Sequence, residues 1–128
     1  DEMGLGKTIQ TIALLATLKT FELLCGKASL IILPKSILPN WGKEFTTWAP
    51  SMNVFTFYGA KDDRTNLKSE FSKIQPDVVL TTYEMARMEV TFLAKQKWEY
   101  VIIDEAHKIK NENSSTANVV RKFTCNHR

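Results

Sequence analysis

Two glycines, a lysine and a threonine stand close together at the start of the chain: Gly4, Gly6, Lys7 and Thr8, with Leu5 between the glycines. In a glycine-rich loop the backbone N–H groups can point inward at phosphate oxygens, a lysine reaches the β- and γ-phosphates, and a threonine hydroxyl ligates Mg²⁺. An apolar stretch of helical period follows, and a helix N-terminus favours anions. The segment predicts a nucleotide-phosphate site. The simpler interpretation is a glycine-rich turn that leads into an ordinary helix.

Two adjacent carboxylates, Asp104 and Glu105, follow the apolar run 101–103 almost a hundred residues later. A buried strand that ends in two acids can present one to a metal ion and the other to an attacking water. We expect Asp104 to hold Mg²⁺ through water and Glu105 to orient and deprotonate the attacking water. Two solvated acids at a strand end are the alternative, but together with the glycine-rich segment the pair predicts a nucleoside triphosphatase.

Asp1 departs from the general phosphate-loop pattern, because it stands where that pattern has its opening glycine. The segment 1–8, followed by Ile9, Gln10 and Thr11, resembles motif I of the Swi/Snf-type ATPases, a branch of the superfamily-two helicases, in which the aspartate is the family's own variant. The similarity continues in Leu33–Ser36 with Asn40, Trp41, Glu44 and Phe45 (motif Ia), in Leu80–Met85 (motif Ib), and in 104–111 (motif II, beginning with the DEAH box). Among the subfamilies, the sequence is most similar to the imitation-switch (ISWI) chromatin remodellers.

This resemblance implies the first RecA-like lobe of a DNA-dependent ATPase motor that uses ATP and Mg²⁺ to translocate on duplex DNA and remodel nucleosomes in the nucleus, together with other subunits of a remodelling complex. It implies that His107 couples the nucleotide site to a later motif. It also implies contacts to the phosphodiester backbone of DNA, which carry no base specificity, from five residues: Pro34, Lys35, Ser36, Thr81 and Thr82. From their chemistry alone, these five residues fit a solvated loop as well as they fit a DNA contact. Two alternatives for the whole protein are a related ATPase of DNA repair or transcription, and a nucleotide-binding scaffold that does not hydrolyse.

Strand-like and helix-like segments alternate, which is typical of a parallel sheet covered by helices on both faces. The expected fold class is therefore α/β. Strands are predicted at 30–33, 53–57, 78–81 and 100–104. Helices are predicted at 7–24, from Pro39 through Trp48, at 62–74, at 83–94, and after a cap at Ser114 or Ser115. Trp41, Phe45 and Trp48 recur at helical spacing, which favours core packing over base stacking.

The 128 residues amount to a single-domain length with a net charge of +3, and the basic residues are scattered among the acids. No stretch approaches the roughly 20 consecutive apolar residues of a membrane span. We expect residues 1–128 to be a partial ATP-binding lobe from a longer protein, truncated at both ends, with the second lobe and flanking domains elsewhere. Since a second lobe supplies arginines to the γ-phosphate, and an arginine finger is worth on the order of 10³ to 10⁵ in rate, the piece alone is expected to be inactive.

Overall fold

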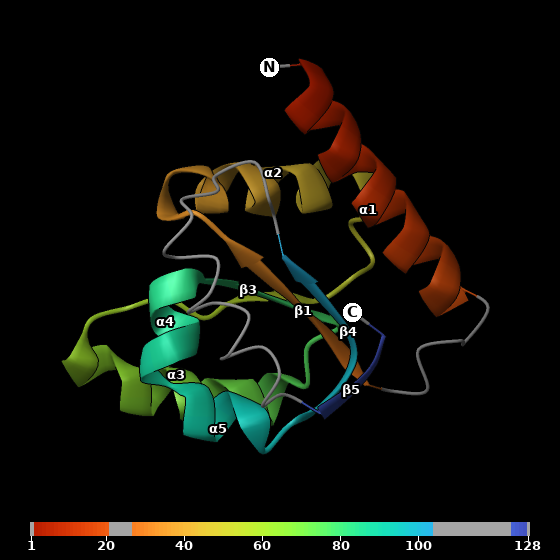
Figure 1. Ribbon diagram of the computed structural model, residues 1–128. Coiled ribbons are helices and arrows are strands. Elements are labelled where there is room, and N and C mark those ends of the chain that lie inside the picture. The colour runs from red at the N-terminus through yellow and green to blue at the C-terminus, as the bar shows by residue number, and fades with distance from the viewer. Residues whose placement is uncertain (1, 21–26, 104–123, 128) are drawn as a thin grey trace.

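A parallel five-stranded sheet forms the centre of the computed structural model, which describes residues 2–20, 27–103 and 124–127, with the side chains of 2–7, 20 and 124–127 left undescribed. The strands are β1 (Ala28–Leu33), β2 (Val54–Thr56), β3 (Val78–Thr82), β4 (Lys97–Ile103) and β5 (Thr124–His127), in the spatial order β2-β3-β1-β4-β5. Every neighbouring pair is parallel. The α/β class predicted from the alternating segments is therefore confirmed (Figure 1).

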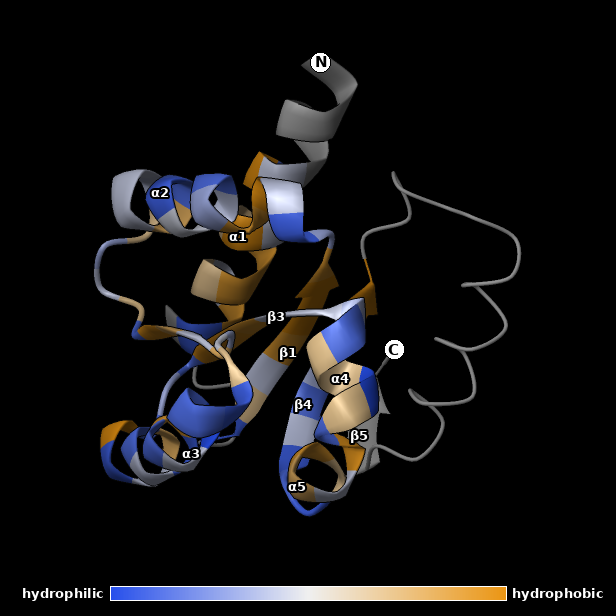
Figure 2. Cartoon of the chain, turned by 90° about the vertical axis from the view of Figure 1, so that its left-hand side faces the viewer, coloured by the Kyte–Doolittle hydropathy of each residue, from blue (hydrophilic) through white to orange (hydrophobic). Residues whose placement is uncertain are grey.

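Helices cover both faces of this sheet, as Figure 1 shows. Side chains alternate along β1: Leu30 and Ile32 belong to one buried cluster, and Ile31 and Leu33 to the other. The first cluster packs against α3 (Lys61–Ile74), α4 (Tyr83–Met88) and α5 (Val90–Ala94), and the second against α1 (Glu2–Thr20) and α2 (Leu38–Trp48). In Figure 2 the strands β1 and β3 are mostly hydrophobic, whereas α3 carries much hydrophilic surface. None of the helices in the described part of the chain is long and apolar enough to cross a membrane.

Four details differ from the sequence prediction. The first helix begins at Glu2 instead of near Lys7, and its predicted end at 24 lies outside the described residues. The strand β5 lies where no strand was assigned. The helix expected at 83–94 is two helices separated at Glu89. The carboxylate of Glu89 accepts from Arg64 Nη1 at 3.3 Å and pairs with Lys68 Nζ at 2.7 Å, both on α3, and this attachment accompanies the interruption. The helix expected after Ser114 or Ser115 lies outside the described residues.

Trp48 is the fourth difference, because the core packing expected for it is wrong. Trp41 and Phe45 are 5% and 1% exposed, as predicted, but Trp48 is 56% exposed. It occupies the last position of α2, and its indole N–H turns back to donate to Glu44 Oε2 at 2.8 Å. Helical spacing identifies a face of the helix, but it does not tell whether the final turn still has the sheet beneath it.

A carboxylate closes the edge of the sheet where the strands begin, called here the amino edge. Asp77 Oδ2 accepts from Lys19 Nζ at 2.6 Å and from the Asn53 N–H at 2.8 Å, which ties α1 and the approach to β2 to the start of β3. We expect Asp77→Ala to lower the free energy of unfolding by about 1 to 2 kcal/mol, since two interactions with a partly exposed charge are lost. Lys19→Ala removes the ion pair and a hydrogen bond of 3.2 Å to the Ser51 carbonyl, but it leaves the Asn53 bond to Asp77 in place. It should cost less than about 1 kcal/mol, because the lysine side chain is partly exposed to solvent. Urea unfolding of the two variants side by side checks this order, and equal costs would contradict it.

Candidate functional site

The strands end together at the opposite edge, called here the carboxyl edge, and open parallel sheets bind ligands just outside this edge. The register places Leu33 of β1 beside Thr82 of β3, and Ile32 beside Ile103 of β4. The N-terminal end of α1 lies beyond the arrowheads of β1 and β4 in Figure 1. The topology therefore brings the glycine-rich segment, the end of β1 and the end of β4 to one side of the sheet.

The glycine-rich segment is helical in this structure, because α1 begins at Glu2. A loop was expected through Gly6. Glu, Met, Leu and Lys are good helix formers, so local preference extends the helix, although each glycine lowers helix stability by about 1 kcal/mol relative to alanine. In this conformation the N–H groups of Gly6, Lys7 and Thr8 bond to carbonyls of the preceding turn and do not form a cradle. The residue types suit nucleotide phosphates, but the described backbone does not yet have the shape of such a site.

Thr8 is the one predicted nucleotide-site residue whose side chain is described, and it is 4% exposed. The side chains of Gly4 to Lys7 are not described, and Asp104, Glu105 and His107 lie outside the described residues. The strand β4 ends at Ile103, one residue before Asp104 in the sequence. The predicted order of apolar strand and then carboxylates thus agrees with the described end of β4.

Of the residues expected to contact DNA after β1, Pro34 is buried, whereas Lys35 and Ser36 are exposed. Lys35 opens a short 3-10 helix, η1 (Lys35–Ile37), that leads into α2. Its ammonium nitrogen lies 5.5 Å from the centre of the Tyr58 ring, which follows β2. A hydrogen bond with Tyr58, the charge of that phenol and, to a smaller extent, the charge of Glu84 raise the pKa of Lys35 above its ordinary value. The ammonium is therefore protonated throughout the neutral pH range.

Thr81 and Thr82, at the end of β3, are 0% and 4% exposed. The Thr81 hydroxyl donates to the Phe57 carbonyl at 2.8 Å, and the Thr82 hydroxyl accepts from the Met85 N–H at 3.1 Å, which caps α4. The expectation that these hydroxyls grip a DNA strand does not fit this arrangement, because both are buried and engaged within the protein. Threonines at a strand end can satisfy backbone groups as well as they can bind a ligand, and sequence alone does not separate the two roles.

Tyr58 is a surface residue at this edge that the sequence analysis did not single out. It is 36% exposed and stands beside Lys35. The sequence does contain an indication: an aromatic residue comes just after a strand whose end lies at the carboxyl edge. We call Lys35, Ser36 and Tyr58 the Lys35 rim.

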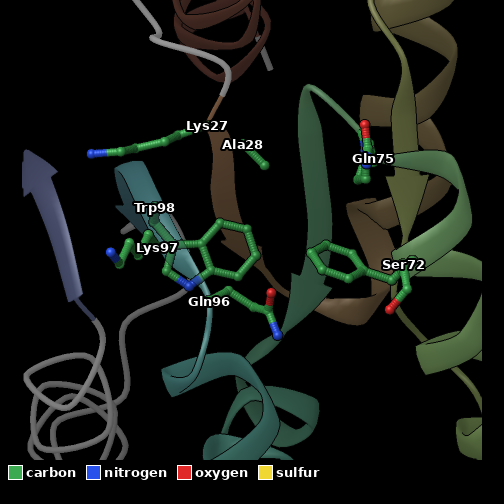
Figure 3. A pocket seen from close by; sticks show the side chains of 9 residues that line it. Lys27, Ala28, Ser72, Gln75, Gln96, Lys97 and Trp98 are labelled. Carbon is green, nitrogen blue, oxygen red and sulfur yellow. The ribbon is translucent and has the colours of Figure 1, made fainter.

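A separate hollow of about 470 Å³ lies at the amino edge, with Phe71, Gln96 and Trp98 in its lining. The Gln96 amide donates to the Phe92 carbonyl, and the Trp98 N–H donates to the Leu93 carbonyl, so these groups already bond within the protein. Figure 3 shows the side chains of Lys27 and Lys97 extending away from the Trp98 ring. Among the predicted site residues whose side chains the structure describes, none lines this hollow.

Known proteins resemble the chain over its full length. The SNF2-related domain family matches residues 1–128. The chain belongs to this family. The family is the one that the four motif-like segments predicted from the sequence, so the resemblance is confirmed.

Among the curated relatives of this SNF2-related chain is the human "SWI/SNF-related matrix-associated actin-dependent regulator of chromatin subfamily A member 1", 46% identical over 129 residues, which covers 100% of this chain and 12% of that protein. "ISWI chromatin-remodeling complex ATPase ISW2" of Saccharomyces cerevisiae is 44% identical, over 96% of this chain and 11% of its own length. This yeast relative is an ISWI protein by name, in agreement with the similarity to imitation-switch remodellers predicted from the sequence. The chain spans about one eighth of the human relative.

A solved structure supplies the fold comparison. The "Sulfolobus solfataricus SWI2/SNF2 ATPase core in complex with dsDNA" superposes with a TM-score of 0.79 at 35% identity, covering 98% of this chain and 25% of that one. The "Sulfolobus solfataricus SWI2/SNF2 ATPase core domain" gives a TM-score of 0.78 at 34% identity, covering 98% of this chain and 24% of that one. The parallel sheet with helices on both faces is thus the RecA-like fold of these ATPase cores, as predicted.

Proposed function

We propose that residues 1–128 are the ATP-binding part of a DNA-dependent ATPase motor that moves along duplex DNA and remodels nucleosomes. The observation that carries this proposal is the family match over the whole chain, together with the likeness to an ATPase core solved with double-stranded DNA. The exposed Lys35 rim at the carboxyl edge, on the side of the sheet toward which the N-terminus of α1 extends, supports it. The proposed setting is the nucleus, in a complex with other remodelling subunits.

The nucleotide side of the proposal uses the glycine-rich segment and the two carboxylates. Backbone N–H groups of Gly4, Leu5 and Gly6 bind phosphate oxygens once the helix starts later, near Lys7, whose ammonium faces the terminal phosphates. Thr8 and Asp104 hold Mg²⁺, which supplies charge neutralisation for the phosphates when bound. Glu105 accepts the proton of the attacking water, and His107 links this site to the rest of the motor.

The DNA side of the proposal uses the carboxyl-edge loops. Lys35 and Ser36 are exposed and offer an ammonium, a hydroxyl and backbone N–H groups, the donors that bind phosphodiester oxygens without reading bases. Pro34, Thr81 and Thr82 are buried beneath them, so we assign to these three the support of the rim and leave direct contact to their exposed neighbours. In this proposal all five predicted residues belong to one DNA site, two as direct contacts and three as buried supports.

Stimulation of hydrolysis by DNA is the property that tests the proposal. In the full-length protein we expect ATP turnover with Mg²⁺ to be slow alone and at least ten-fold faster with duplex DNA, since an arginine finger that DNA brings into place contributes on the order of 10³ to 10⁵ in rate. Phosphate release would be measured with and without a short duplex, and chelation of Mg²⁺ should abolish both rates. Turnover that is fast without DNA and indifferent to it would contradict a DNA-dependent motor.

A further inference from the structure

Lys35 and Tyr58 come from loops that follow different strands, yet they meet at the carboxyl edge. The Lys35 ammonium lies 5.5 Å from the Tyr58 ring centre. The strands β1 and β2 are not neighbours, since β3 lies between them. The side chains therefore reach across the end of β3, above the buried Thr81 and Thr82. The exposed cation and the exposed aromatic ring come together because the strand order places β3 between β1 and β2.

The backbone that carries Tyr58 is held from the β3 side. The Phe57 N–H donates to the Leu80 carbonyl at 2.8 Å, which continues the pairing of β2 with β3 beyond Thr56. The Phe57 carbonyl accepts from the buried Thr81 hydroxyl at 2.8 Å. Both polar backbone groups of the residue before Tyr58 are thus fixed. Thr81 therefore affects this edge indirectly, because its hydrogen bond fixes the backbone from which Tyr58 projects.

The residue after Tyr58 is held from the α3 side. A Cβ atom added to Gly59 would lie 3.1 Å from Leu67 Cδ1 and 3.4 Å from Asp63 Cβ, so the backbone at Gly59 approaches α3 closely. Phe57 is 1% exposed and part of the core cluster, whereas Tyr58 belongs to neither core cluster. An exposed aromatic ring on a backbone fixed at both sides is pre-organised for a contact outside the protein.

We propose that Tyr58 is a positioning residue for the DNA backbone contact, which holds the Lys35 ammonium at the rim so that it meets a phosphate of duplex DNA. This proposal rests on the proposed function. A free lysine side chain samples many rotamers, and a partner that restricts them lowers the ordering cost of binding. The Tyr58 ring attracts the ammonium, which lies 5.5 Å from the ring centre. The carboxylate of the exposed Glu84 also influences Lys35 and would repel a phosphate at this place. A Lys35 ammonium held at the rim by Tyr58 counteracts this repulsion.

The test measures duplex DNA affinity of the full-length protein by fluorescence anisotropy across a range of salt concentrations. Lys35→Ala should weaken binding and reduce the salt slope by about 0.9, the value for one phosphate contact. Tyr58→Leu should weaken binding about 2- to 5-fold, the range expected from an exposed cation–π pair. Tyr58→Phe keeps the ring and should lie closer to the unaltered protein than to Tyr58→Leu.

The double variant distinguishes positioning from an independent contact. If Tyr58 acts through Lys35, adding Tyr58→Leu to Lys35→Ala should weaken DNA binding no further, within about 1.5-fold, because the two residues form one unit. Independent effects that simply multiply would overturn the proposal. So would a Tyr58→Leu variant that binds DNA as tightly as the unaltered protein while Lys35→Ala does not. If Lys35→Ala itself leaves affinity and salt slope unchanged, the DNA site of the proposed function fails, which is a different result.

Two control variants lie away from the rim. Trp48→Leu removes another exposed aromatic ring, from the last turn of α2, where the chain approaches the start of β2 at the amino edge. Lys43→Ala removes another exposed lysine, from the middle of α2. Both should leave DNA affinity within about 1.5-fold of the unaltered protein, apart from the weak non-specific contribution of one charge. Thermal melting of every variant accompanies the titrations. If Tyr58→Leu melts early, Tyr58→Gln, which also removes the aromatic face but keeps a polar side chain, takes its place in the single and double variants.

Discussion

Lys7→Ala should reduce DNA-stimulated ATP hydrolysis by the full-length protein at least about 100-fold, the loss usual when one preorganised charge at a reacting group is removed. Lys7 directly follows the second glycine of the segment that belongs to the SNF2-related family. Its ammonium suits phosphate charge that shifts during cleavage, because it is a point charge on a flexible stem. Hydrolysis would be followed as phosphate release at saturating ATP and DNA.

The affinity for DNA should change less than about two-fold in the same variant, since the proposed DNA contacts, Lys35 and Ser36, lie on another loop, and a single remote charge contributes little. A gel-shift titration beside the ATPase assay separates the two effects. Lys43→Ala, the same change on the exposed face of α2, is the matched control and should retain both activities. Turnover retained by Lys7→Ala would contradict the role of this lysine, and loss of DNA binding along with turnover would point to a structural defect.

The central strands could be predicted from the sequence because their environment leaves little choice. Strands buried on both faces of a parallel sheet consist of nearly continuous apolar residues. The runs 30–33 and 78–80 have this composition, and all of their residues are 0% exposed. The short β5 could not be found in this way, since Thr, Cys, Asn and His make no apolar run. Its pairing with β4 comes from the neighbouring strand and not from its own composition.

The roles of single residues at the carboxyl edge were harder to predict, because they depend on what lies across the sheet. Thr81 is a plausible DNA ligand by type, but the Phe57 carbonyl, 24 residues away, takes its hydroxyl. The Lys35 ammonium meets Tyr58 only through the strand order β2-β3-β1. Family resemblance indicated the loops after β1 and β3. Which residues of those loops are exposed and which are buried required the structure.

The start of α1 shows the opposite case, where local preference and the expected site disagree. Residues 2–6 include three good helix formers, and the helix runs through them. A phosphate cradle needs the N–H groups of the same residues to be released from the helix and to converge on the phosphate oxygens. Because Gly4 and Gly6 each weaken the helix by about 1 kcal/mol relative to alanine, this first turn and a half is the part of α1 that phosphate oxygens could reorganise at the smallest cost.

Glu105→Gln should keep ATP binding but lower hydrolysis by about 10² to 10⁴-fold, the contribution of a positioned general base. The amide has nearly the same shape as the carboxylate, yet it cannot accept a proton from the attacking water. Nucleotide affinity should stay within about two-fold, because Glu105 is assigned to the water and not to the metal or the phosphates. Single-turnover hydrolysis and a fluorescent-nucleotide titration, both with Mg²⁺, measure the two quantities.

Asp104→Asn should differ from Glu105→Gln in the titration, and this difference is the decisive part of the prediction. Asp104 is assigned to Mg²⁺, so an uncharged amide in its place should weaken nucleotide binding when Mg²⁺ is present and have little effect when the metal is chelated. Glu105→Gln should show no such dependence on Mg²⁺. The two acids are adjacent in the sequence just after the apolar end of β4, so the two substitutions are matched in type and place. If both variants had the same nucleotide affinity with and without Mg²⁺, the assignment of one acid to the metal and the other to the water would be wrong.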